Sequence, residues 1–139
     1  MDDLDEDDIE CLQRGQHTFL PGTDAAGRPI YVSMTGQHCS DKSIESQARA
    51  KWYGIMTAYR NEIVQETGMV VIIYEVGSTF KQIREHMKGV PMYLSALQMK
   101  AASTHFCCDD ATIQIVISTL LNFLTKRTRL RFRYHYGKY

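Results

Sequence analysis

Hydrophobic residues recur at steps of three and four along residues 112–124, a spacing that predicts one apolar face of a helix. The apolar positions are Ile113, Val116, Ile117, Leu120, Leu121 and Leu124. A short apolar run precedes the helix at residues 102–108, and residues 129–135 alternate apolar with basic side chains, so both flanking stretches are predicted strands. The helix is apolar over more of its circumference than contact with one sheet face requires. We therefore expect this helix either to be deeply buried or to present a second apolar face to another apolar surface or molecule.

The rest of the chain also alternates between strand and helix patterns. Extended stretches are predicted at residues 17–20, 30–34 and 69–76, and helices at residues 43–67, 79–88 and 90–99. Ser43 is a suitable N-cap for the first helix, and Gly68 stands where a left-handed residue would end it. This alternation predicts an α/β fold with a mostly parallel sheet and flanking helices.

Composition and charge narrow the class of protein. The chain has 139 residues, which predicts one domain, and its net charge is zero, so no overall field favours nucleic acid or an anionic membrane. The charge is nevertheless polarised, with seven carboxylates in residues 1–10 and six basic side chains in residues 126–138. We expect residues 1–16 to be an acidic, disordered tail and residues 17–139 to form the folded domain.

The cysteines and the known short motifs give no sign of a metal or a cofactor. Cys11, Cys39, Cys107 and Cys108 have neither a CxxC spacing nor the spacing of a Cys/His metal site. The phosphate-loop, dinucleotide, zinc-protease and serine-hydrolase motifs are absent from the sequence. No signal peptide or membrane-length apolar run is seen, so we expect a cytoplasmic protein with free thiols and no cofactor.

Two short stretches hold side chains that could do chemistry. His105 and Cys107 would share one strand face about 7 Å apart at Cα, which is beyond direct hydrogen-bond reach, so His105 is interpreted as structural or pocket-lining rather than as a catalytic base. Asp109 and Asp110 lie between the predicted strand and the predicted helix. They are interpreted as a helix cap, and an acid/base or metal-binding pair is the alternative.

The last predicted strand carries a row of arginines. Arg129, Arg131 and Arg133 alternate along the chain and would therefore share one strand face. A solvated edge-strand face and a phosphate-binding surface both fit this pattern. Because the rest of the chain adds no basic surface, nucleic acid is not an expected partner.

Several segments together resemble the CRAL-TRIO lipid-binding domain family, over about residues 19–137. Residues 23–30, TDAAGRPI, resemble the family's D-x-x-G-R-P segment. The predicted helix ending at Gly68, followed by MVVIIYEVG, looks like the family's next helix and strand. Residues 97–106, LQMKAASTHF, are similar to the stretch in which leucine-proline, a variable residue and arginine precede an alanine-isoleucine-histidine strand. A helix and a basic strand then follow in the family order.

The resemblance implies a non-enzymatic carrier, which holds one lipid in an apolar cavity floored by the sheet and enclosed by the flanking helices. Residues 112–124 would be the gate helix that moves at a membrane surface to admit the lipid, so transient membrane association is implied. The ligand contacts are expected from Tyr74, His105, Cys107, Val116, Leu120, Phe123, Thr128 and Arg131. Of these, Thr128 and Arg131 fall at the family's headgroup positions on the strand after the gate.

The chain departs from the family's pattern, and other functions stay open. Met99 stands where the phosphatidylinositol site has a glutamate, and Gln98 replaces a proline. The usual helical cap is replaced by the acidic segment and the chain ends where the family continues, so a reduced member or a fragment is expected. One alternative is a protein-interaction module of the same fold with a collapsed cavity, docking a small GTPase or a similar partner. The other is a hydrolase that uses His105 with Asp109 or a cysteine.

Overall fold

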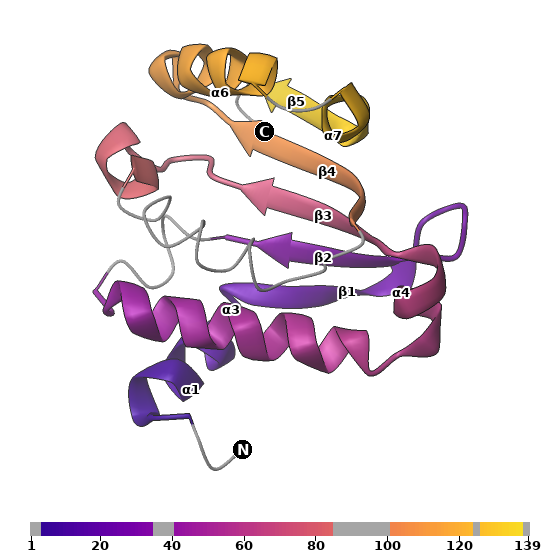
Figure 1. The fold of residues 1–139 in the computed structure, drawn as a ribbon. Coiled ribbons are helices and arrows are strands. Elements are labelled where there is room, and N and C mark those ends of the chain that lie inside the picture. The colour runs from indigo at the N-terminus through magenta and orange to yellow at the C-terminus, as the bar shows by residue number, and fades with distance from the viewer. Residues whose placement is uncertain (1–3, 35–40, 85–100, 124–125, 138–139) are drawn as a thin grey trace.

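The computed structural model describes residues 4–34, 41–84, 101–123 and 126–137, which build a five-stranded sheet with helices (Figure 1). The strands are β1 (His17–Thr23), β2 (Pro29–Ser33), β3 (Met69–Tyr74), β4 (Ala101–Cys108) and β5 (Phe132–Tyr136). The helices are α1 (Glu6–Gln13), α3 (Ile44–Tyr59), α4 (Glu62–Thr67), α6 (Ala111–Phe123) and α7 (Lys126–Arg131). Residues 80–84 are helical too, at the start of the helix predicted over residues 79–88. The predicted helix at residues 90–99, with Gln98 and Met99, lies outside the described residues, as does Cys39.

The sheet has the order β1-β2-β3-β4-β5 and is mostly parallel, which confirms the predicted α/β class. β1 pairs with β2 in antiparallel orientation, while β2, β3, β4 and β5 are parallel to their neighbours. The carboxyl ends of β2, β3 and β4 therefore point to the same edge of the sheet (Figure 1). Such an edge is where open α/β sheets usually bind ligands.

The turn between β1 and β2 is built by the residues of the D-x-x-G-R-P segment. Asp24 Oδ2 accepts hydrogen bonds from Arg28 Nε at 2.8 Å and from Arg28 Nη2 at 2.6 Å, while its Oδ1 accepts from the Arg28 backbone N–H at 2.9 Å. Gly27 has φ +76°, a left-handed conformation that glycine adopts without a steric penalty. These interactions form the turn that joins β1 to β2.

The two faces of the sheet differ in what packs on them. The face called here the helical face carries Tyr31, Ser33, Val71, Ile73, Phe106 and Cys108, and its side chains contact Ile55 of α3, Val64 of α4, Ile83, and Ile113 and Ile117 of α6. The opposite face, called here the histidine face, carries Val32, Val70, Ile72, Tyr74, His105, Cys107, Arg133 and His135. Helices α3, α4 and α6 thus pack on the helical face through these side chains, while Ala50 of α3 packs against α1.

The helix predicted over residues 43–67 is two helices, α3 and α4. Ser43 caps α3 as predicted, because its hydroxyl accepts the Ser46 N–H at 3.0 Å. Asn61 then caps α4, with its Oδ1 accepting the Ile63 N–H at 2.9 Å. An asparagine that bonds the backbone two residues ahead competes with helix continuation, so the chain restarts there. Gly68 ends α4 with φ +78°, in agreement with its predicted role.

The helix predicted at residues 112–124 is α6, and Asp110 is its N-terminal cap. Asp110 Oδ1 accepts the backbone N–H groups of Thr112 at 2.7 Å and Ile113 at 3.1 Å, which confirms the capping interpretation for this carboxylate. Asp109 has a different task, since its Oδ1 accepts the Gly77 N–H at 2.9 Å and ties the end of β4 to the turn after β3. Asp109 and Asp110 thus hold the loops that follow β3 and β4 in place.

The predicted strand over residues 129–135 is wrong in its first half. Lys126–Arg131 form the short helix α7, and β5 begins only at Phe132. Arg129 and Arg131 therefore do not share a strand face with Arg133. The alternating pattern is compatible with a strand, but three closely spaced long basic side chains are equally good helix formers.

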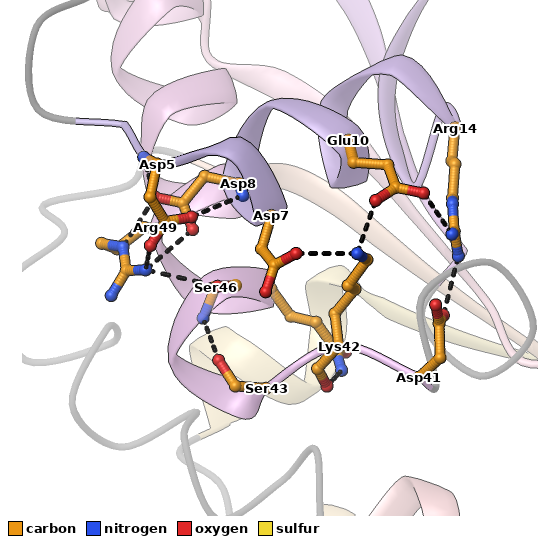
Figure 2. Close-up of polar contacts among 11 residues, drawn as sticks. Asp5, Asp7, Asp8, Glu10, Arg14, Asp41, Lys42, Ser43, Ser46 and Arg49 are labelled. Carbon is orange, nitrogen blue, oxygen red and sulfur yellow. Dashed lines mark hydrogen bonds and ion pairs between the residues drawn. The ribbon is translucent and has the colours of Figure 1, made fainter.

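The prediction of a disordered acidic tail is wrong for Glu6–Gln13, which form α1 (Figure 2). Asp5 and Asp8 make a reciprocal capping box at its start, with the Asp8 N–H donating to Asp5 Oδ1 at 2.9 Å. Cys11 of α1 is fully buried against Ala50 of α3. The acidic segment is therefore a docked helix rather than a solvated chain.

Ion pairs to the start of α3 hold α1 in place. Arg49 donates from Nε to Asp8 Oδ2 at 2.7 Å and from Nη2 to Asp8 Oδ1 at 2.9 Å, and it also pairs with Asp5. Lys42 pairs with Asp7 at 2.7 Å and with Glu10. The sequence predicts a disordered acidic tail, because the basic partners of these carboxylates are more than 30 residues away along the chain.

Candidate functional site

The histidine face brings together three of the predicted ligand-contacting residues. In the strand register Tyr74 of β3 is opposite Cys107 of β4, which is opposite His135 of β5. The neighbouring row is Ile72, His105 and Arg133. Tyr74, His105 and Cys107 are all half-buried, so they lie side by side on one surface.

His105 and His135 form the closest polar contact on this face. His105 Nδ1 lies 2.9 Å from His135 Nε2, and the rings stack with centroids 5.1 Å apart and an interplanar angle of 8°. Burial lowers the pKa of His105, and the neighbouring His135 and Arg133 lower it further. The lowered pKa favours the neutral imidazole of His105, and the tautomers decide which ring donates its N–H in this contact.

The β2–β3 side of the histidine face is apolar. Val32 and Val70 are 9% and 7% exposed, and Ile72 and Tyr74 are half-buried next to them. On the β5 side the row ends in His135 and in the exposed Arg133. The side chains of this face therefore change from aliphatic at β2 and β3 to imidazole and guanidinium at β5.

The α6 residues of the predicted site are not on this face. The N-terminal half of α6 packs directly on the helical face, where Ile113 and Ile117, 1% and 7% exposed, contact Phe106 and Cys108. Because alternate residues of a strand point to opposite faces, His105 and Cys107 lie on the far side of β4 from α6. Val116 is half-buried, and Leu120 and Phe123 also belong to α6. The structure therefore does not bring Tyr74, His105 and Cys107 together with the packed side of α6, as a shared cavity would require.

Thr128 and Arg131 are also displaced from their predicted positions. Both belong to α7 rather than to the last strand. Arg131 is exposed, and its Nη1 lies 3.4 Å from the backbone carbonyl of Ala101, at the beginning of β4. Ala101 is the first residue of β4, whereas His105 lies in the second half of that strand. Arg131 is therefore near the amino end of β4 and the histidine pair is nearer its carboxyl end.

The geometry gives little support to nucleophilic or metal chemistry. Burial, together with the adjacent Cys108, raises the pKa of the Cys107 thiol, which disfavours the reactive thiolate. No group of three or more histidine, cysteine, aspartate or glutamate side chains suited to a metal ion is found among the described residues. Asp109 and Asp110 are engaged with backbone N–H groups rather than with each other.

His135 is the site residue that sequence reasoning missed. It was recognised only as the end of an alternating basic stretch. Its role depends on which strand pairs with β4 and in which register, and neither follows from local pattern. A second histidine on a strand predicted to neighbour the strand of His105 was the available signal.

The comparisons with known proteins add no assignment. The sequence matches no protein-family model, and it matches none of the curated proteins with which it was compared. The resemblance to the CRAL-TRIO family accordingly stays a prediction. In the described part of the chain, no helix has the length and apolar character needed to cross a membrane.

Proposed function

We propose that this protein binds one hydrophobic small molecule or phospholipid, without chemical conversion, on the histidine face of its sheet. The observation that carries the proposal is the grading of that face. Ile72 and Tyr74 are half-buried and supply apolar surface next to the buried Val32 and Val70, while His105 and His135 supply a polar end. A molecule with an apolar body and a polar head would match both parts.

The binding energy would come mainly from apolar surface. Moving an acyl chain out of water is worth about 0.8 kcal/mol per CH₂, but that gain largely disappears when the chain comes from a bilayer. Selectivity must then come from shape and from the polar head. The histidine pair can contact the polar head, because His105 Nε2 and His135 Nδ1 are not used in the contact between the two rings.

The cellular role proposed on this basis is exchange of the ligand with a membrane surface, and transient membrane contact belongs to the same proposal. α6 remains the proposed moving element. Its outward Ile115 is 67% exposed, which is the kind of apolar side chain that inserts among lipid headgroups.

Binding of a fluorescent phospholipid to the purified full chain tests the proposal. Tyr74→Ala should weaken binding about tenfold, because a large half-buried ring on the histidine face is lost; a tenfold change equals about 1.4 kcal/mol. Ile115→Ala is the matched control and should leave the affinity for lipid monomers unchanged. Equal affinity of wild type and Tyr74→Ala would contradict the assigned surface.

A protein-interaction module is the second candidate, and the direct packing of Ile113 and Ile117 on the sheet favours it. In that case the N-terminal half of α6 is a fixed part of the core rather than a gate. The protein-interaction function would be favoured by two results together: the wild-type protein binds no lipid, and the α6 surface captures one protein partner.

A further inference from the structure

A group of buried polar atoms lies on the helical face, away from the histidine face. Ser33 and Tyr31 are each 1% exposed, yet Ser33 Oγ and Tyr31 OH have no hydrogen-bond partner in the described part of the chain. The same holds for Oε1 of Gln16, a residue that is 0% exposed. A buried polar atom left unpaired costs about 1–3 kcal/mol, and most such atoms in folded proteins have a partner.

The neighbours of these residues are on α3. Tyr31 and Ser33 are two residues apart on β2 and so point to the same face, where Tyr31 contacts Ile55. A Cβ at Gly54 would lie 3.9 Å from the Tyr31 ring, which places this turn of α3 above Tyr31. α3 leaves the carboxyl end of β2 and runs back across the sheet (Figure 1), so an earlier turn of α3 covers a later residue of β2.

Lys51 occupies that earlier turn. It lies three residues before Gly54 and four before Ile55, and so on the same side of the helix. Gln47, one turn earlier again, accepts a hydrogen bond from Gln16 Nε2 at 3.1 Å. The spacing places Lys51 on the side of α3 that faces β2, and its charge interacts with Glu75, which follows β3.

The surroundings of Lys51 disfavour its charged ammonium form unless an anion lies beside it. Burial lowers its pKa, and Glu75 only partly opposes this effect. Glu75 is 2% exposed, and its Oε2 accepts the Ser78 hydroxyl at 2.9 Å. Within the described residues no carboxylate comes close enough to Lys51 to form an ion pair, although other cations of the protein have such partners.

We propose that Lys51, Ser33, Tyr31 and Gln16 form a binding site for a small oxyanion that retains an O–H group, such as hydrogen phosphate or a soluble phosphate monoester. Lys51 supplies the charge, and the Ser33 and Tyr31 hydroxyls donate to the anion oxygens. The anion O–H donates to Gln16 Oε1, an acceptor that has no donor in the described part of the chain. The site lies at the carboxyl ends of β2 and β3, and it is independent of the lipid proposal because it is on the other face of the sheet.

Titration calorimetry of the full chain with inorganic phosphate, at constant ionic strength set by chloride, tests this site. Wild type should bind one phosphate per chain. Lys51→Met should weaken binding at least tenfold, and Ser33→Ala should weaken it severalfold. Arg60→Met is the matched control, since Arg60 is an exposed cation at the end of α3, and it should bind as wild type does. Absence of binding, or equal loss in Arg60→Met, would overturn the proposal.

A second measurement uses the wild-type protein alone and so does not depend on the folding of any variant. The pKa of Lys51, followed by NMR after selective isotope labelling, should rise when phosphate is added, because a bound anion favours the charged amine. Glucose phosphate and citrate serve as further probes: binding of the phosphate ester but not of citrate supports the assigned class. A Lys51 pKa that is unchanged by saturating phosphate would refute the site.

Discussion

The pairing of His105 with His135 shows how one contact fixes the chemistry of a surface. His105 Nδ1 and His135 Nε2 lie 2.9 Å apart, a distance that accommodates one proton between the two nitrogens. Because the pKa of His105 is lowered, protonation favours the unfolded chain. The contribution of this residue to stability is therefore complete above its ordinary pKa and declines as pH falls below it.

Replacing His135 should move the pKa of His105 back toward its ordinary value. His135→Asn removes the neighbouring imidazole while leaving burial almost unchanged, so NMR titration should report a rise in the pKa of His105. Arg133→Gln is the comparison variant and should produce a smaller rise, since His135 has the larger influence. No change in His135→Asn would show that the two rings do not interact in solution.

At the scale of elements, α6 combines a packed side with an exposed side. Ile113 and Ile117 are buried against β4, while Ile115 is 67% exposed on the same helix. These isoleucines cannot be distinguished by residue type, and only their positions around the helix separate them. The excess apolar surface noted in the sequence is therefore real at Ile115.

Substitutions at these two positions should differ sharply. Ile117→Ala should lower the free energy of unfolding by about 2–5 kcal/mol, because it leaves a cavity against Phe106. Ile115→Ala should change it by less than about 0.5 kcal/mol. Denaturant unfolding of both variants measures the difference, and similar small effects would mean that α6 is not held on the sheet.

The docking of α1 makes a separate prediction about charge. Burial by itself raises the pKa of Asp8, but hydrogen bonds from Arg49, Ser46 and Asp5 outweigh it, so the pKa lies below its ordinary value. The stabilisation is then present above the ordinary carboxylate pKa and is lost as pH falls through the lowered one. α1 should stay docked at neutral pH and detach in strong acid.

Hydrogen exchange of the α1 amides measures this docking. Asp8→Ala removes the capping-box partner and both bonds to Arg49, and should destabilise the docked helix by about 1–3 kcal/mol. Asp7→Asn is the control, because Asp7 is 54% exposed and holds only Lys42; surface pairs of this kind are worth less than about 1 kcal/mol. Unchanged protection in Asp8→Ala would show that the ion pairs do not anchor α1.

At the scale of the molecule, local patterns predicted the elements better than their assembly. Alternation and helical spacing located β2, β3, β4 and α6, because burial on a sheet imposes those periods. The break at Asn61 and the helix α7 were missed, since both depend on competition between nearly equal local conformations. The placement of Tyr74, His105 and Cys107 on the face opposite α6 could not be predicted, because it depends on the face on which each crossover packs.

The central claim concerns the whole molecule: the histidine face holds one amphipathic guest. Native mass spectrometry of the freshly purified full chain, with organic extraction of the same sample, tests it most directly. We predict a single non-covalent adduct of lipid mass per chain, which is extractable into organic solvent and is diminished in Tyr74→Ala. A wild-type chain that carries no adduct, and takes up none after incubation with phospholipid vesicles, would contradict the claim.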